Sequence, residues 1–203
     1  MRNINRLNEE IARWAFEIIH KNNTSWKIAF TNPTAGPWKT IKAPSKSMGI
    51  EGEVYRFILE EDRPDIIMFH DELETVIIIE AKDSLAKLLD EEQAKKSAAV
   101  VVKLANLLRS RGKNVFWRGR ENYKVVLGLL WGSTGHPENE AAKNRLYDHY
   151  HDLVMDEDVV FSNLVIGVET LYKSGSLRCE AFYKSYVGGD LALGDRIIET
   201  LVR

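Results

Sequence analysis

Two short apolar runs in the first half of the chain predict a β-hairpin. They cover 63–68 and 75–82 and are joined by a short polar link. Runs of this length that are bounded by charge or turn residues are typical of β-strands. Because side chains alternate between the two faces of a strand, Glu80 and Lys82 share one face of the second strand and Ala81 takes the other.

The open end of this hairpin brings acidic and basic side chains together. In an antiparallel pair the start of one strand lies beside the end of the next, so we expect Asp65 near Glu80 and Lys82. Two carboxylates at such a distance repel each other unless a divalent cation lies between them. Mg²⁺ takes oxygen ligands, activates a bound water and neutralises charge on a phosphate. Lys82 would orient or deprotonate the attacking water, or stabilise the transition state.

The spacing of these residues resembles the signature of the PD-(D/E)XK nucleases. The chain has Pro64-Asp65, then fourteen residues, then Glu80-Ala81-Lys82. That family includes most type II restriction endonucleases and many repair and recombination nucleases. The resemblance implies that Asp65, Glu80 and the backbone carbonyl of Ala81 bind Mg²⁺, with Mn²⁺ as a substitute, and that Lys82 serves the water. The alternative interpretation is a buried hairpin whose charged ends are only solvated.

The N-terminal stretch 4–21 has apolar residues three and four positions apart, which predicts an amphipathic helix. Glu10 and Glu17 lie together at the edge of its apolar stripe. PD-(D/E)XK nucleases often place a glutamate of the first helix beside the metal site. By that resemblance Glu17 or Glu10 is a catalytic candidate, and an ordinary glutamate at the edge of the core is the alternative.

The remaining hydrophobic pattern alternates between helix and strand periods. It predicts a short strand at Trp26–Phe30 inside a long loop over 22–52, a strand at Val54–Leu59, a helix from Leu85 to Arg111 with a break near Asp90, a strand at Tyr123–Trp131, a helix at Glu138–Met155, a hairpin of Asn163–Tyr172 and Leu177–Tyr186, and a helix at Leu191–Val202.

This order of elements predicts an α/β (mixed-sheet α+β) protein. Helix, three strands, helix and strand in succession form the αβββαβ core that the PD-(D/E)XK resemblance implies. With 203 residues, 44% of them hydrophobic, the chain is long enough for one substantial core. We expect a single domain over 1–203, with the core at about 4–131 and an extension at 132–203 for dimerisation or specificity.

Charge is distributed unevenly along the chain, although the formal net charge is only −2. Residues 51–92 hold fourteen acids and four bases, whereas 95–124 hold nine bases and one acid, and 18–50 hold five lysines and no acid. Basic segments around an acidic cluster suit a nuclease that follows a phosphate backbone. A solvated helix face is the alternative for 95–124. The candidate DNA contacts in these segments are Lys39, Lys42, Lys46, Lys113, Arg118 and Arg120.

Composition also argues against several other classes of protein. Cys179 is the single cysteine and cannot form an internal disulfide, which fits a reducing cytoplasm. No stretch is apolar enough to predict a membrane span. The sequence contains no Gly-rich loop that ends in Lys-Ser or Lys-Thr, so we do not expect ATP hydrolysis by a phosphate-binding loop. His149 and His151 diverge on a helix, so we expect surface residues there rather than a metal site.

The sequence therefore predicts a Mg²⁺-dependent endonuclease that hydrolyses double-stranded DNA. The long extension beyond the core favours a type II restriction endonuclease that acts as a homodimer, because a palindromic duplex presents two equivalent phosphates. One alternative is a repair or recombination nuclease, such as a resolvase, with the same fold. Another is a DNA-binding or partner subunit that needs a second chain for cleavage.

Overall fold

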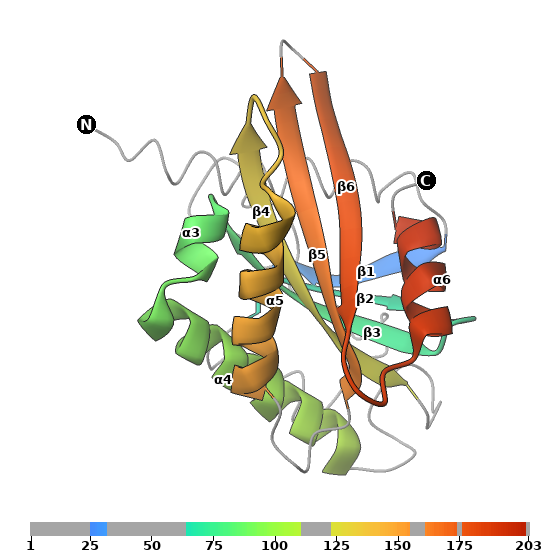
Figure 1. Ribbon diagram of the computed structural model, residues 1–203. Helices are drawn as coiled ribbons and strands as arrows, with labels where there is room; N and C mark the ends of the chain where they lie inside the picture. The colour runs from blue at the N-terminus through green and yellow to red at the C-terminus, as the bar shows by residue number, and fades with distance from the viewer. Residues whose placement is uncertain (1–24, 32–63, 111–122, 155–160, 174–175, 202–203) are drawn as a thin grey trace.

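The computed structural model of the protein describes residues 25–31, 64–110, 123–154, 161–173 and 176–201. Across these ranges the chain forms a six-stranded mixed sheet and four helices (Figure 1). The strands lie in the sheet in their sequence order, from β1 to β6. The expected α/β class with a mixed sheet is confirmed.

The predicted hairpin forms the centre of this architecture. Strand β2 is Ile66–His70 and β3 is Thr75–Lys82, and they pair antiparallel from Ile66 opposite Ile79 to His70 opposite Thr75. Every residue of β2 and the first five of β3 are buried. Near-continuous apolar runs of this kind suit strands that are covered on both faces.

The segment after β3 crosses over the sheet and returns in the parallel direction. Helix α3 is Leu85–Leu88 and α4 is Glu91–Ser110, so the expected break near Asp90 is confirmed. Asp90 causes the break, because its side chain accepts the Gln93 N–H at 3.0 Å and its carbonyl accepts the Ala94 N–H at 2.8 Å, which starts a new helix. Strand β4, Lys124–Thr134, then pairs parallel with β3.

The outer neighbour of β2 is the short strand expected within the 22–52 loop. Strand β1, Trp26–Thr31, pairs antiparallel with β2, with Trp26 opposite His70. Both edges of β2 are therefore occupied, by β1 and β3. The helix expected at 4–21 and the strand expected at Val54–Leu59 lie outside the described residues.

The C-terminal part extends the same sheet, and its helices and strands follow in the order that the sequence predicted. Helix α5, Glu140–Val154, leads to β5, Phe161–Lys173, which pairs parallel with β4. Strand β6, Ser176–Ser185, returns antiparallel along β5, and α6, Leu191–Leu201, follows it. Figure 1 shows β5 and β6 running past the ends of the other strands.

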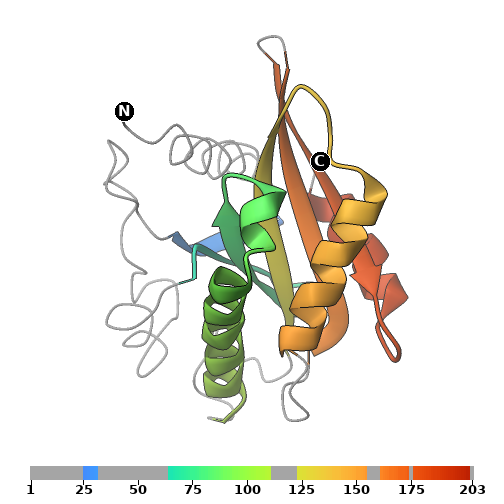
Figure 2. The same cartoon turned by 60° about the vertical axis from the view of Figure 1, so that its left-hand side comes forward.

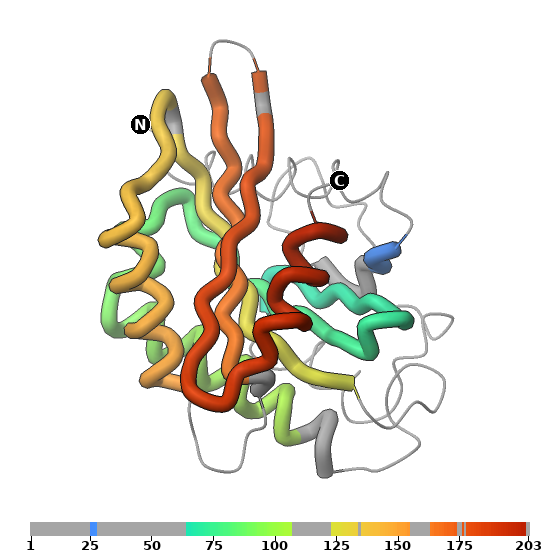
Figure 3. The backbone as a smooth tube through the Cα atoms, turned by 45° about the vertical axis from the view of Figure 1, so that its right-hand side comes forward, coloured from blue at the N-terminus to red at the C-terminus, as the bar shows by residue number. Residues whose placement is uncertain are grey.

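The helices cover the two faces of the sheet unequally. Helices α3, α4 and α5 lie together on one face of the sheet (Figure 2). Ile78, Leu104, Leu129 and Tyr150 belong to the core cluster on this face. Helix α6 covers the opposite face, where Ile197 belongs to a second core cluster (Figure 3). No helix in the described ranges is long and apolar enough to cross a membrane.

Candidate active site

Asp65 is fixed at the open end of the hairpin by hydrogen bonds to β3. Its backbone N–H donates to the Ile79 carbonyl at 3.1 Å, which sets it beside the end of β3. Its side-chain Oδ2 accepts the Ala81 N–H at 2.8 Å. Asp65 is only 5% exposed, so backbone hydrogen bonds rather than water satisfy its carboxylate. The predicted approach of the strand ends is confirmed.

Strand alternation directs the three candidate side chains to one face. Glu80 and Lys82 follow Ile78 in the alternation, and Ile78 lies in the core under α3, α4 and α5. Asp65 stands two residues before Ile67, which belongs to the same core. Ala81 is fully buried in the cluster on the opposite face.

The Lys82 ammonium lies among the oxygens that were expected to bind a metal. It forms a short ion pair with Glu80 Oε1 and donates to the Ala81 carbonyl at 3.1 Å. Asp65 Oδ2 lies 3.9 Å from the same Nζ. The side chains of Asp65, Glu80 and Lys82 are only 6%, 12% and 15% exposed. Two carboxylates that are buried to this extent need a nearby positive charge, and Lys82 supplies it.

The same oxygens are the kind of ligand that a hard divalent cation prefers. Two carboxylates and one carbonyl lie around a single positively charged atom, the Lys82 ammonium. Among the described residues, no group of three or more His, Cys, Asp or Glu side chains could hold a metal. A site with two acids suits Mg²⁺, which keeps several waters, better than a closed protein cage.

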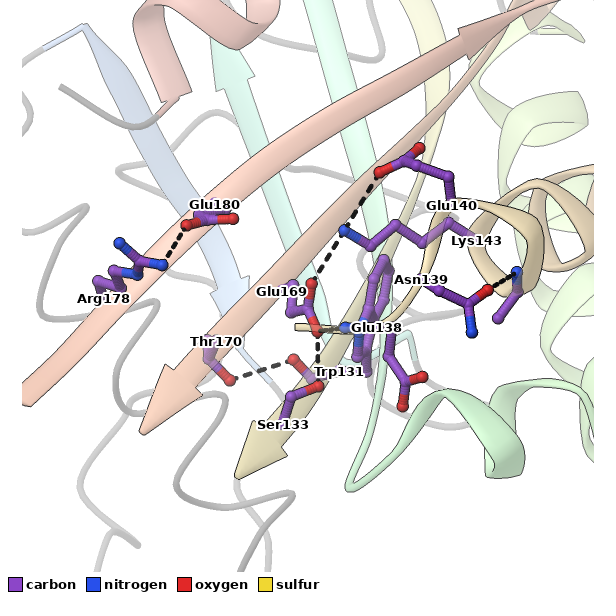
Figure 4. Close-up of polar contacts among 11 residues, drawn as sticks. Trp131, Ser133, Glu138, Asn139, Glu140, Lys143, Glu169, Thr170, Arg178 and Glu180 are labelled. Carbon is purple, nitrogen blue, oxygen red and sulfur yellow. Dashed lines mark hydrogen bonds and ion pairs between the residues drawn. The ribbon is translucent and has the colours of Figure 1, made fainter. Parts of the chain in front are cut away.

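A second buried ion pair lies further across the sheet and was missed in the sequence. Glu169 on β5 is 0% exposed, and its Oε1 accepts the Ser133 hydroxyl at 2.6 Å and the Glu138 N–H at 2.7 Å (Figure 4). Its Oε2 lies 3.1 Å from Nζ of Lys143 on α5. The Lys143 ammonium also lies 3.7 Å from the centre of the Phe182 ring.

The Glu169–Lys143 pair lies in the same cross-strand row as the end of β3. Trp131 on β4 is paired with both Lys82 and Glu169, so Glu169 stands two strands away, about 10 Å from Lys82 at normal strand spacing. Its partners hold the segment between β4 and α5 against β5. One sequence signal could have identified Glu169 as a buried acid: it ends an apolar run, as Glu80 does.

Other predicted site residues fall outside the described part of the chain. These are Glu10, Glu17, Lys39, Lys42, Lys46, Lys113, Arg118 and Arg120.

The two histidines expected at the surface are only partly exposed. His149 and His151 are half-buried, and the His151 ring stacks on Tyr186 with 3.5 Å between ring centres.

A cavity of about 380 Å³ lies at the opposite end of the hairpin from Asp65. It is lined by Lys27, His70, Glu72 and Arg196 among others, and none of the three candidate site residues borders it. Acids and bases both line this cavity, so it does not favour a ligand of one charge.

Comparison with known proteins gave no match, whether with family models, with curated proteins or with solved structures.

Proposed function

We propose that the protein is a Mg²⁺-dependent endonuclease that hydrolyses phosphodiester bonds of double-stranded DNA. The observation that carries this proposal is the convergence of Asp65 Oδ2, Glu80 Oε1 and the Ala81 carbonyl on one cationic atom. A purely structural hairpin end has no need for two buried carboxylates of like charge on one face.

The topology around the site supports a PD-(D/E)XK type of core. An antiparallel hairpin carries the acids, and a helical crossover leads from the lysine to a parallel strand. The hairpin, the crossover and the parallel strand correspond to the last two β-strands of the βββ unit and the αβ that follows it in the αβββαβ order. We propose that the rest of the chain completes this core, including its first helix.

In this proposal the chain itself supplies both ligands and orientation. Asp65, Glu80 and the Ala81 carbonyl would hold Mg²⁺, which when bound supplies a more acidic water and neutralises charge on the phosphate. The Ala81 N–H fixes Asp65 Oδ2, so the carboxylate is preorganised. Lys82 contacts both acids, from where its ammonium can orient the attacking water or stabilise negative charge on the phosphate.

The finer assignment is a type II restriction endonuclease. Four elements, α5, β5, β6 and α6, follow β4 and extend the sheet beyond the strands that bear the site. Catalysis at Asp65, Glu80 and Lys82 does not require them, so they are available for base reading or for association of two copies.

The test of this assignment is the sequence of the DNA ends that the protein produces. Purified protein is incubated with a plasmid of random sequence in Mg²⁺ and, as a control, in EDTA. Fragments that share a short symmetric sequence at their ends would support restriction. Cutting confined to branched or damaged DNA would reassign the protein to the repair or recombination nucleases. Salt-sensitive DNA binding without cleavage would favour a partner subunit.

A further inference from the structure

Strands β5 and β6 form a two-stranded ribbon that extends beyond the rest of the sheet, at the end where β3 carries the candidate site. The row of paired residues that contains Lys82 continues through Trp131 to Glu169. Beyond this row β5 continues for four more residues, to Lys173, which adds about 13 Å at normal strand rise. Figures 1 and 3 show this end of the ribbon clear of the helices. The ribbon therefore projects past the candidate site from the same end of the sheet.

The neighbouring strand and the segment after it hold this ribbon in place. The Gly135 N–H, just after β4, donates to the Tyr172 carbonyl at 3.1 Å. Lower on the ribbon, the Ser133 hydroxyl donates to Glu169 at 2.6 Å. Strands β5 and β6 pair without a register shift along their shared length. An element that is already ordered loses little conformational freedom when it binds a partner.

Two basic side chains near the end of the ribbon lie on the face that bears the site. Residues opposite one another in paired strands share a face, and so do alternate residues of one strand. By these rules Lys173 and Arg178 lie on the same face as Lys82. Lys173 is exposed, and the Arg178 side chain is 67% exposed. The Arg178 guanidinium lies 2.9 Å from Glu180, at the rim of the sheet.

The position of these two charges suits a DNA duplex that also reaches the site. At normal strand rise and strand spacing, Lys173 and Arg178 each lie about 16 Å from Lys82 in the plane of the sheet. One strand of B-form DNA covers that distance in about five nucleotides. A second copy of the protein suits this surface less well, because lysine is depleted at protein interfaces.

We propose that the end of the β5–β6 ribbon is a DNA-contact surface, in which Lys173 and Arg178 bind backbone phosphates about five nucleotides from the phosphate at the site. This inference rests on the proposed function. Arg178 exchanges its ion pair with Glu180 for one with a phosphate, and the ordered ribbon fixes the duplex relative to the site. The candidate DNA contacts from the sequence all lie between 39 and 120, so this surface is an addition from the C-terminal part.

The experiment measures how DNA binding depends on salt in the double variant Lys173→Gln/Arg178→Gln. Binding of a fluorescein-labelled duplex of mixed sequence is followed by anisotropy in EDTA, where no metal-dependent cleavage occurs. The logarithm of the association constant falls linearly with the logarithm of the salt concentration, by about 0.9 for each phosphate contact. The double variant should therefore lose about two from this slope, and each single variant about one.

Lys27→Gln/Lys124→Gln is the matched control, because it removes the same charge from the opposite end of the sheet. Lys27 forms a partly exposed ion pair with Asp71, and Lys124 forms one with Asp190. Lys124 begins β4 and is paired with the first residue of β3, whereas the site lies at the last residues of β3. The control should keep the wild-type slope. Both double variants should denature near the wild-type temperature, since all four substituted side chains are exposed.

Four outcomes would overturn the proposal, and plasmid cleavage by the wild type in Mg²⁺ separates them from a failure of the proposed function. A wild-type slope in Lys173→Gln/Arg178→Gln would reject the contact. Equal losses in both double variants would show that only the overall charge matters. Weaker self-association in sedimentation without DNA, at an unchanged slope, would make the ribbon an interface between two copies. With cleavage intact, these three results leave the proposed function standing. A wild-type protein that neither binds nor cuts DNA would reject the proposed function and this surface with it.

Discussion

At the scale of single residues, the proposed function gives Lys82 two roles: it balances the charge of two carboxylates, and it acts on the water or the phosphate. The two roles can be separated by experiment. Its ammonium lies against Glu80 and 3.9 Å from Asp65, so it balances both carboxylates while no divalent cation is bound. An unbalanced charge in a site with this little exposure is costly, because solvent cannot compensate for it. In the proposed function a divalent cation would take over this balance, which would leave the lysine available for the water or the phosphate.

Lys82→Met should therefore lower the free energy of unfolding in EDTA by about 3 kcal/mol, because two neighbouring carboxylates lose their counter-charge. Adding Mg²⁺ should restore part of this loss, and should stabilise the variant more than the wild type. Urea denaturation with and without Mg²⁺ measures both effects. The control is Lys95→Met, which removes an exposed ion pair with Glu91 on α4 and should leave the free energy of unfolding almost unchanged, because solvent screens the pair. A variant as stable as the wild type in EDTA would show that Lys82 does not balance these acids.

The three main site residues were accessible from the sequence because they depend on local rules. Period-two alternation places Glu80 and Lys82 on one face, and antiparallel pairing brings Asp65 to them. The Glu169–Lys143 pair was not accessible in this way. It depends on how α5 lies against β5, which no local pattern specifies.

At the scale of elements, the Glu169–Lys143 pair fastens α5 and the segment before it to β5. Glu169 Oε1 accepts hydrogen bonds from a hydroxyl and a backbone N–H, and Glu169 Oε2 forms an ion pair with the Lys143 ammonium. The charges of these two almost fully buried side chains therefore balance each other. When one partner of such a pair is removed, the other charge remains in the core without compensation.

Glu169→Gln and Lys143→Met should each lower the free energy of unfolding by about 3 kcal/mol, because each leaves one buried charge. The double variant should lose less than the sum of the two, since neither charge then remains. Chemical denaturation of the wild type, the two single variants and the double variant measures the four free energies of unfolding that this double-mutant cycle needs. Additive losses would mean that the two side chains do not stabilise each other.

The order of helices and strands was largely predictable, whereas several contacts between elements were not. Asp90 gave a local signal for the break between α3 and α4, because Asp is favoured at a helix start. The pairing of β1 with β2 and of β5 with β4 joins strands that are distant in sequence, so hydrophobic periodicity predicts their existence but not their neighbours. Ser84 precedes α3 at the cap position, yet its hydroxyl donates to Asp83 at 3.2 Å and makes no capping bond.

At the scale of the whole molecule, the proposed function requires one metal site in each chain. One such site cuts one strand, so cleavage of both strands requires two copies related by a dyad. We expect nicked circular plasmid to accumulate at low protein concentration and linear plasmid to dominate at high concentration. Gel analysis over a protein dilution series, with sedimentation of the same samples, measures this. Linear product from a protein that sediments as a monomer on DNA at every concentration would contradict a homodimer.

The proposed hydrolysis of DNA at Asp65, Glu80 and Lys82 can be tested on one variant, Asp65→Asn, by its single-turnover cleavage of plasmid. This change keeps the shape of the side chain and an oxygen that can accept the Ala81 N–H, but removes the charge that would bind the metal. Glu72→Gln, at the exposed turn on the far end of the hairpin, is the control. In Mg²⁺, Asp65→Asn should be at least about a thousandfold slower than the wild type, a loss of about 4 kcal/mol in transition-state stabilisation, while Glu72→Gln cleaves normally. A folded Asp65→Asn protein that cleaves DNA at the wild-type rate would contradict the account.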